Sequence, residues 1–163
     1  LAAYNSIEKI NPTTVTAGIL NVIENSGLMC RYEVYCKHPK IIFDASHNVE
    51  SISAFLHEFE KEKGNYKEVN LIFGIMKDKK IDEIVEILKD KFDNYLLTSI
   101  NNERAADTFT LNEKFIGVGC NTEIVDNPHQ YILDHQKNGG NSCLVVLGSI
   151  YLLGEIKKML IKA

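Results

Sequence analysis

Short, uninterrupted apolar runs alternate with amphipathic stretches from residue 31 to the end of the chain. Such runs are typical of strands buried on both faces, and the stretches between them place apolar residues at helical spacing. This alternation predicts an α/β fold: a Rossmann-like three-layer sandwich around a mostly parallel sheet of about six strands. The first two strands are close enough to form a hairpin, so we expect an antiparallel edge. The predicted strands are 31–36, 40–43, 69–73, 95–98, 123–125 and 143–147, and the predicted helices are 49–61, 79–91, 107–115, a helix opened by Asn127-Pro128, and 150–161.

The first 30 residues follow a different pattern. Asn11-Pro12 breaks an initial helix, and Thr13 or Thr14 can cap a second one. Asn25-Ser26-Gly27 is a typical end for that helix. The segment has no evident core of its own. The expected domains are therefore a helical appendage over 1–30 and an α/β domain over 31–163.

The composition excludes several classes of protein. The chain has 163 residues, of which 45% are hydrophobic and 25% charged, as in one globular domain. A net charge of −4 argues against a basic surface that wraps nucleic acid. No apolar run approaches the ~20 residues that a membrane-spanning helix needs. The four cysteines form no C-x-x-C pair, and we see no leader segment, so we expect reduced thiols in a cytoplasmic protein without nucleic-acid or membrane partners.

Polar residues follow the predicted strand 40–43 directly, in the sequence Asp44-Ala45-Ser46-His47-Asn48. Ligands bind beyond the carboxyl ends of strands in sheets of this kind. Asp44 can accept hydrogen bonds from ribose hydroxyls or from an amine, and the start of the next helix offers free N–H groups to an anion. The alternative is structural: Asp44 or Asn48 caps the helix, and His47 is a solvated loop residue.

Three further junctions lie at the same predicted edge. Gly148-Ser149 joins the last strand to the last helix, where Gly allows close backbone approach and the Ser hydroxyl can cap the helix or bind an anion. Residues 74–80 carry several charges, with Asp78 as a helix cap in the structural alternative. Arg104 is one of only two arginines among 18 basic residues, and it can bind an anion or pair with Asp107.

Several catalytic motifs are absent from the sequence. It contains no G-x-x-x-x-G-K-[ST] phosphate loop, G-x-G-x-x-G turn, G-x-S-x-G elbow or H-E-x-x-H helix. We therefore expect the chain to perform no phosphoryl chemistry by itself. We predict no metal site, because the remaining histidines lack ligand spacing and suit surface or structural roles. These are His38, His57, His129 and His135.

Five ordered landmarks together resemble one family. D-A-S-H-N at 44–48 is similar to the D-G-A-H-N motif of folylpolyglutamate synthase and dihydrofolate synthase, in the Mur ligase superfamily. The likeness covers 31–163 and implies the C-terminal domain type of that superfamily, while 1–30 resemble the last helices and linker of the preceding ATPase domain. The other landmarks are Arg31, where the family has P-G-R; F-G-I-M-K-D-K at 73–79, similar to F-G-M-x-x-D-K; Arg104-Ala105, matching R-A; and L-G-S-I-Y-L-L-G-E at 147–155, similar to G-S-x-Y-L-x-G-E.

The sequence departs from the family pattern at three places. Met29-Cys30 replaces Pro-Gly before Arg31, which bears on how that arginine is presented. Ala45-Ser46 replaces Gly-Ala, and Glu103 stands where Pro is common.

The resemblance implies an ATP-dependent amide ligase that adds L-glutamate to folate, or also to dihydropteroate, through an acyl phosphate. In the family, ATP phosphates and Mg²⁺ bind to an N-terminal phosphate-loop domain, so we expect this chain to bind neither tightly and to be inactive alone. By motif, Arg31 and Asp44 bind the nucleotide, and His47 and Ser149 lie at the reaction centre as catalytic residues. The substrate-binding residues implied by the resemblance are His47, Asn48, Asp78, Arg104 and Ser149.

Two other functions stay open: a non-catalytic module that binds a nucleotide or metabolite, and the equivalent domain of another Mur-type ligase. The ligase interpretation requires the loops 44–48 and 148–149 to meet at the tips of adjacent strands. There they would form half of a clamp, with the ATPase domain as the other half.

Overall fold

The structure is a computed structural model that describes residues 12–21 and 29–162. Helix α1 (Pro12–Leu20) is the element described before the α/β unit. It begins at Pro12, so Thr13 and Thr14 lie inside the helix, and the prediction that one of them caps it is wrong. Proline suits a first helical position because its missing N–H has no partner to lose there. The predicted helix end at Asn25-Ser26-Gly27 lies outside the described residues.

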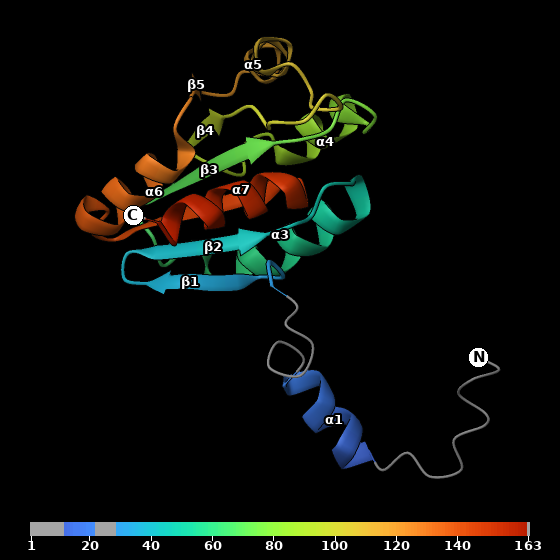
Figure 1. The fold of residues 1–163 in the computed structure, drawn as a ribbon, viewed down its shortest axis with the longest axis vertical. Helices are drawn as coiled ribbons and strands as arrows, with labels where there is room; N and C mark the ends of the chain where they lie inside the picture. The colour runs from blue at the N-terminus through green and yellow to red at the C-terminus, as the bar shows by residue number, and fades with distance from the viewer. Residues whose placement is uncertain (1–11, 22–28, 163) are drawn as a thin grey trace, which may run out of the picture.

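Residues 29–162 contain a six-stranded sheet with the order β1-β2-β6-β3-β4-β5 (Figure 1). β1 runs antiparallel to β2, and the other neighbouring pairs are parallel. The predicted mixed sheet with an antiparallel edge is therefore confirmed. The strands are β1 (Glu33–Lys37), β2 (Lys40–Asp44), β3 (Glu68–Gly74), β4 (Asn94–Leu97), β5 (Thr122–Ile124) and β6 (Ser142–Gly148).

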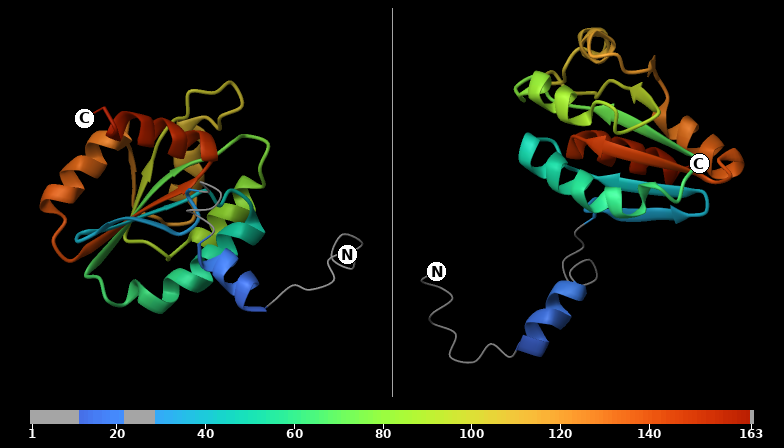
Figure 2. Two further views of the ribbon diagram at one scale, coloured as in Figure 1. Left: turned by 60° about the horizontal axis from the view of Figure 1, so that its bottom comes forward. Right: turned by 180° about the vertical axis from the view of Figure 1, so that it is seen from behind.

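Helices cover both faces of this sheet, which confirms the predicted three-layer sandwich (Figure 2, left). The side chains of successive strand residues point to opposite faces. Ile42 thus belongs to one apolar cluster, while Ile41 and Phe43 belong to the other. The first cluster packs under α3 (Val49–Lys63), α4 (Ile81–Leu88) and α5 (Thr108–Gly117), and the second under α6 (Pro128–Asn138) and α7 (Ile150–Leu160).

Several predicted boundaries differ from the structure. The first strand begins at Glu33 rather than at residue 31. Helix α4 ends at Leu88 because the backbone of Asp90 is left-handed, with φ 59°, and the chain then turns into β4. The buried Tyr95 hydroxyl accepts the backbone N–H groups of Lys91 and Phe92, which holds this turn in place.

The winding of the chain reverses at two places along the sheet. β2 and β3 lead into α3 and α4 on one face, whereas β6, which lies between them, leads into α7 on the other. In the same way, β4 leads into α5 and its neighbour β5 leads into α6 on the opposite face. Crevices outside the carboxyl ends of strands at such reversals are the usual ligand sites of open α/β sheets.

Candidate functional site at the ends of β2, β6 and β3

Three strand ends meet at the first reversal. Asp44 of β2 lies opposite Leu147 of β6, and Gly148 lies opposite Gly74 of β3. The loops that follow these strands therefore start side by side at one edge of the sheet. The expected meeting of loop 44–48 with Gly148-Ser149 is confirmed.

Gly148 presses the end of β6 against β3. Its φ is +128°, and a Cβ there would lie 2.2 Å from the carbonyl oxygen of Gly74. The next residue, Ser149, donates its backbone N–H to that same oxygen at 3.0 Å. The Ser149 side chain is buried and caps α7 by accepting the Tyr151 N–H at 3.2 Å. Only glycine fits the approach that fixes Ser149 and the start of α7.

His47 is half-buried and has a defined ring orientation. Its Nδ1 lies 2.8 Å from the carbonyl oxygen of Ala45. A carbonyl only accepts, so Nδ1 must carry a proton, and in the neutral ring Nε2 is then the acceptor. The backbone N–H of His47 donates to Ser51 Oγ at 3.2 Å, which anchors the loop to α3. Since His47 lines two hollows, its imidazole is available to a ligand.

The first hollow has a volume of 510 Å³ and contains Arg31, Asp44 and His47. Asp44 is 5% exposed, and its two carboxylate oxygens accept the Tyr32 N–H at 2.6 Å and the Ser46 N–H at 2.8 Å. One carboxylate thus ties together the segment before β1 and the loop after β2.

The segment around Arg31 has an unusual backbone. Both of its neighbours are left-handed, Cys30 with φ 61° and Tyr32 with φ 46°. Glu33 accepts the Cys30 N–H at 2.8 Å and forms an ion pair with Lys157 of α7 at 2.6 Å. Burial alone would raise the pKa of Glu33, but the hydrogen bonds from Lys157 and Cys30 outweigh it and lower that pKa. The exposed Arg31 side chain therefore projects from a firmly held segment.

The second hollow is smaller, at 180 Å³, and brings together His47, Ser149, Arg104 and Lys79. Its remaining lining residues are Met76, Ile150 and Tyr151. This hollow joins residues that are up to 104 positions apart in the sequence (His47 to Tyr151). Two cationic side chains and the start of α7 surround it, an arrangement suited to carboxylates.

Asp78 lies beside this second hollow. It accepts hydrogen bonds from Arg104 at 3.1 Å and from Lys79 at 3.2 Å. The hydrogen bond from Lys79, followed by that from Arg104, lowers the pKa of Asp78, so the pair stays charged. Asp78 does not cap α4, because Lys80 occupies the N-cap position of that helix. Arg104 does not pair with Asp107, which instead caps α5 through the Thr110 N–H. Both structural alternatives are therefore wrong.

Asn48 takes the structural role that the sequence left open. Its side-chain oxygen accepts the Ser51 N–H at 2.8 Å and caps α3, and Ser51 Oγ accepts the Asn48 N–H in return. Asn48 also lines the first hollow from its exposed position. A ligand role for Asn48 stays a prediction.

Sequence reasoning did not assign Tyr32 and Lys79 to the site. Tyr32 lines the first hollow, and its hydroxyl donates to Glu62 of α3 at 2.7 Å. Lys79 belongs to the F-G-I-M-K-D-K segment, so its signal was present in the motif. Tyr32 had no comparable signal, because its position depends on the left-handed turn before β1.

The described residues contain no group of three His, Cys, Asp or Glu side chains that could hold a metal ion. No helix over residues 12–21 and 29–162 is long and apolar enough to cross a membrane.

A family model described as Mur ligase, glutamate ligase domain, matches residues 30–150. The chain belongs to this family. The matched span includes every residue of the predicted site, from Arg31 to Ser149. The mixed sheet and the paired loops are thus features of a Mur ligase C-terminal domain.

Two curated relatives are named dihydrofolate synthase/folylpolyglutamate synthase. The Bacillus subtilis protein is 26% identical over 133 residues, which are 80% of this chain and 30% of the relative. The Buchnera aphidicola protein is 29% identical over 92 residues, which are 56% of this chain and 22% of the relative. The chain thus spans less than a third of the length of either relative.

Solved structures show the same fold. The structure of E. coli FolC in complex with DHPP and ADP has a TM-score of 0.80 at 19% identity, over 99% of this chain and 37% of that one. The bifunctional folylpolyglutamate synthase/dihydrofolate synthase with Mn, AMPPNP and L-glutamate bound has a TM-score of 0.69 at 18% identity, over 82% of this chain and 32% of that one. The Mur ligase C-terminal domain therefore superposes on about a third of each of these enzymes.

Proposed function

We propose that this chain is the C-terminal domain of an ATP-dependent ligase that joins L-glutamate to folate, and also to dihydropteroate if the parent enzyme is bifunctional. The observation that carries the proposal is the place of His47 at the boundary of two hollows. One contains the residues matched to the nucleotide motif, and the other contains Ser149 with Arg104 and Lys79. The names of the curated relatives support this substrate pair.

The first hollow is the proposed nucleotide side. The planar guanidinium of Arg31 suits a phosphate or the face of a purine ring. Each oxygen of Asp44 already accepts one backbone N–H, but a carboxylate oxygen can accept more than one hydrogen bond. A ribose hydroxyl can therefore donate to Asp44 without displacing the bonds that hold the Arg31 segment.

The second hollow is the proposed glutamate side. Arg104, Lys79 and the start of α7 offer positive charge to the glutamate carboxylates. His47 Nε2 is oriented by the bond of Nδ1 to Ala45, and it can accept a hydrogen bond from the substrate amine. That bond would orient the nucleophilic nitrogen toward the acyl carbon. The capping bond of Ser149 Oγ leaves its own proton available to a carboxylate.

The reaction requires a second domain. In the proposed reaction the folate carboxylate attacks the γ-phosphate of ATP, which forms an acyl phosphate and releases ADP. The glutamate nitrogen then attacks the acyl carbon, and the amide forms as phosphate and the amine proton leave. The phosphate loop and the divalent metal would belong to the preceding domain. This domain would close over them, align the two reactants and exclude water, and orientation of that kind is worth roughly 7–11 kcal/mol of barrier.

The test is a ligase assay on the complete native protein that contains this chain. It would measure ATP-dependent incorporation of labelled L-glutamate into dihydropteroate and into a reduced folate. We expect Arg31→Ala and His47→Ala each to lower the rate more than tenfold, about 1.4 kcal/mol or more. His57→Ala, which removes an exposed histidine of α3 outside both hollows, is the matched control and should keep the rate.

Wild-type kinetics in both site variants would remove Arg31 and His47 from the site. Turnover by the isolated 163-residue chain would overturn the assignment of the phosphate loop to another domain. Ligation of an amino acid to a peptidoglycan precursor in place of folate would favour another Mur-type ligase. Nucleotide binding without any ligation would favour the non-catalytic module.

A further inference from the structure

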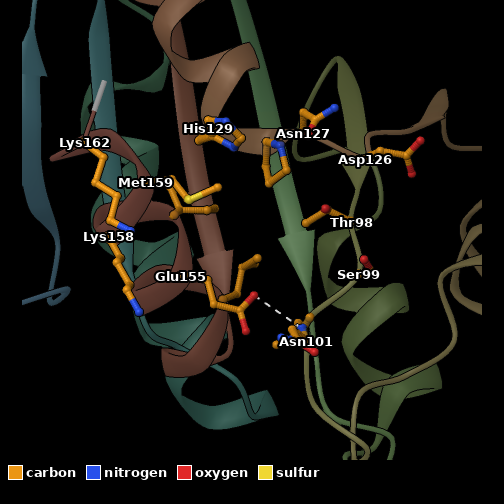
Figure 3. Close-up of a pocket in the computed structure, with 14 residues that line it drawn as sticks. Thr98, Ser99, Asn101, Asp126, Asn127, His129, Glu155, Lys158, Met159 and Lys162 are labelled. Carbon is orange, nitrogen blue, oxygen red and sulfur yellow. Dashed lines mark hydrogen bonds between the residues drawn. The ribbon is translucent and has the colours of Figure 1, made fainter.

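The second reversal of the sheet, between β4 and β5, also carries a pocket. Its volume is 640 Å³, and it lies between the segments that follow these two strands and α7 (Figure 3). It shares no residue with either hollow around His47. The segments after β4 and β5 separate here because α5 and α6 cover opposite faces of the sheet, and the crevice between the start of α6 and α7 stays open.

Thr98 lies at the floor of this pocket. It follows β4, is 3% exposed, and its side chain points from the strand end toward α7 (Figure 3). Its Oγ1 is the one buried side-chain oxygen or nitrogen without a hydrogen-bond partner in the described parts of the chain, 12–21 and 29–162. A buried hydroxyl without a partner is rare and costs stability. A ligand with a polar group at this depth would supply the missing bond.

The start of α6 forms a second wall. Asn127 occupies the N-cap position, but its side chain makes no capping hydrogen bond. Pro128 has no N–H, and the Gln130 N–H donates to the Asn127 carbonyl at 3.1 Å, so the His129 N–H is the donor left in this first turn, at the positive end of an 11-residue helix. His129 of this turn also lines the pocket. The carboxylate of Asp126 is directed away from α7 (Figure 3), so it does not occupy the space between His129 and α7. This wall suits an anionic group.

The facing wall is formed by α7 and suits a hydrogen-bond donor on the ligand. Glu155 is half-buried, and it accepts the Asn101 N–H at 3.3 Å across the pocket (Figure 3). A carboxylate accepts several hydrogen bonds, so its remaining capacity faces the pocket together with the Thr98 hydroxyl. Lys158 of α7 and Lys162, two residues beyond the end of that helix, add positive charge at the rim.

We propose that this pocket binds a small organic anion. Its anionic head, a phosphate or a carboxylate, would sit on the first turn of α6 beside His129. A hydroxyl or amino group at its other end would bond to Thr98 and Glu155. The site would be separate from the proposed ligase site, and its occupancy does not depend on ligase activity.

The binding test uses ¹⁵N-labelled protein of the full 163 residues and four probes. Glycerol 3-phosphate carries two hydroxyls and a phosphate, and glycerate carries two hydroxyls and a carboxylate. Inorganic phosphate tests the anionic group without the hydroxyls, and glycerol tests the hydroxyls without an anionic group. We expect one of the first two to bind saturably, with amide shifts at 98–101 and 127–131, and at least fivefold more tightly than inorganic phosphate or glycerol. The anion that binds shows whether the site takes a phosphate or a carboxylate. Equal binding of inorganic phosphate, or no saturable shift with either anion, would overturn the proposal.

Two variants separate ligand binding from folding. Thr98→Val removes the unpaired hydroxyl at nearly the same volume, so it should weaken binding at least fivefold without lowering Tm. Asn127→Asp keeps a good N-cap but places a negative charge at the head, so it should weaken binding at least tenfold with Tm unchanged or raised. Asn138→Asp adds the same charge at the other end of α6 and should leave binding unchanged. Unaltered affinity in the first two variants would refute the proposed contacts.

Discussion

Gly148→Ala and Gly154→Ala should change stability in opposite directions, although the two glycines are only six residues apart. Gly148 has φ +128°, a conformation that costs a residue with a Cβ about 1–3 kcal/mol. The new Cβ would also lie 2.2 Å from the Gly74 oxygen, and overpacking of this kind adds about 1–3 kcal/mol. Moving β6 away from β3 would further weaken the Ser149 hydrogen bond, worth about 1 kcal/mol. The expected loss is about 3–7 kcal/mol.

Gly154 is the matched control because a Cβ there would meet nothing within 4 Å. It lies inside α7, where alanine is favoured over glycine by about 1 kcal/mol. For a chain of this length, 1 kcal/mol corresponds to about 2–4 °C in Tm. Gly154→Ala should therefore raise Tm by a few degrees, whereas Gly148→Ala should lower it by about 6 °C or more.

Urea unfolding followed by circular dichroism would give both free energies on the same chain. If Gly148→Ala stays within 1 kcal/mol of wild type, the end of β6 is not held against Gly74, and our account of how Ser149 is positioned is incorrect. A loss of similar size in Gly154→Ala would show instead that any methyl group added near α7 is harmful.

Three further predictions concern buried polar groups. Thr98→Val should raise the unfolding free energy by about 1 kcal/mol in urea titrations, because the hydroxyl has no partner to lose, and a loss above 1 kcal/mol would contradict this. Asp44→Asn should lower it by about 2–4 kcal/mol, since the Tyr32 and Ser46 N–H groups donate to different carboxylate oxygens and the amide places an NH2 donor opposite one of them; a change below 1 kcal/mol would argue against these bonds. Burial lowers the pKa of His135, so the unfolded chain binds more protons and stability should fall as the pH drops below about 6.5; His135→Gln should flatten this slope between pH 7.5 and 5, and an unchanged slope would assign it to other groups.

The sequence predicted most of the fold because apolar periodicity is a local signal. The run 143–147 is buried throughout, and it became the centre of β6. Polar residues directly after such runs identified Asp44, His47 and Ser149, and the parallel sheet brought them together. Local capping signals were equally informative, as Asp107 and Ser149 show at the starts of α5 and α7.

The remaining features depend on contacts between segments that have no periodic signal. The ion pair of Arg104 with Asp78 joins two loops 26 residues apart, whereas the sequence indicated only Asp107 as a partner. The left-handed backbone at Tyr32 follows from tertiary hydrogen bonds rather than from residue type. The pocket at Thr98 depends on the packing of α5 and α6 against opposite faces of the sheet, so no local sequence motif indicates it.

The firmly held segment around Arg31 has a consequence for ligand affinity. Its backbone is anchored to α3 through Tyr32, to β2 through Asp44 and to α7 through Glu33. A ligand that contacts the guanidinium orders the arginine side chain but not the backbone of the loop. The cost of ordering that backbone, about 1–2 kcal/mol per residue, is therefore met during folding and does not weaken binding. Preorganisation of this kind lets a single exposed arginine contribute to binding with little of its interaction energy spent on immobilising the chain.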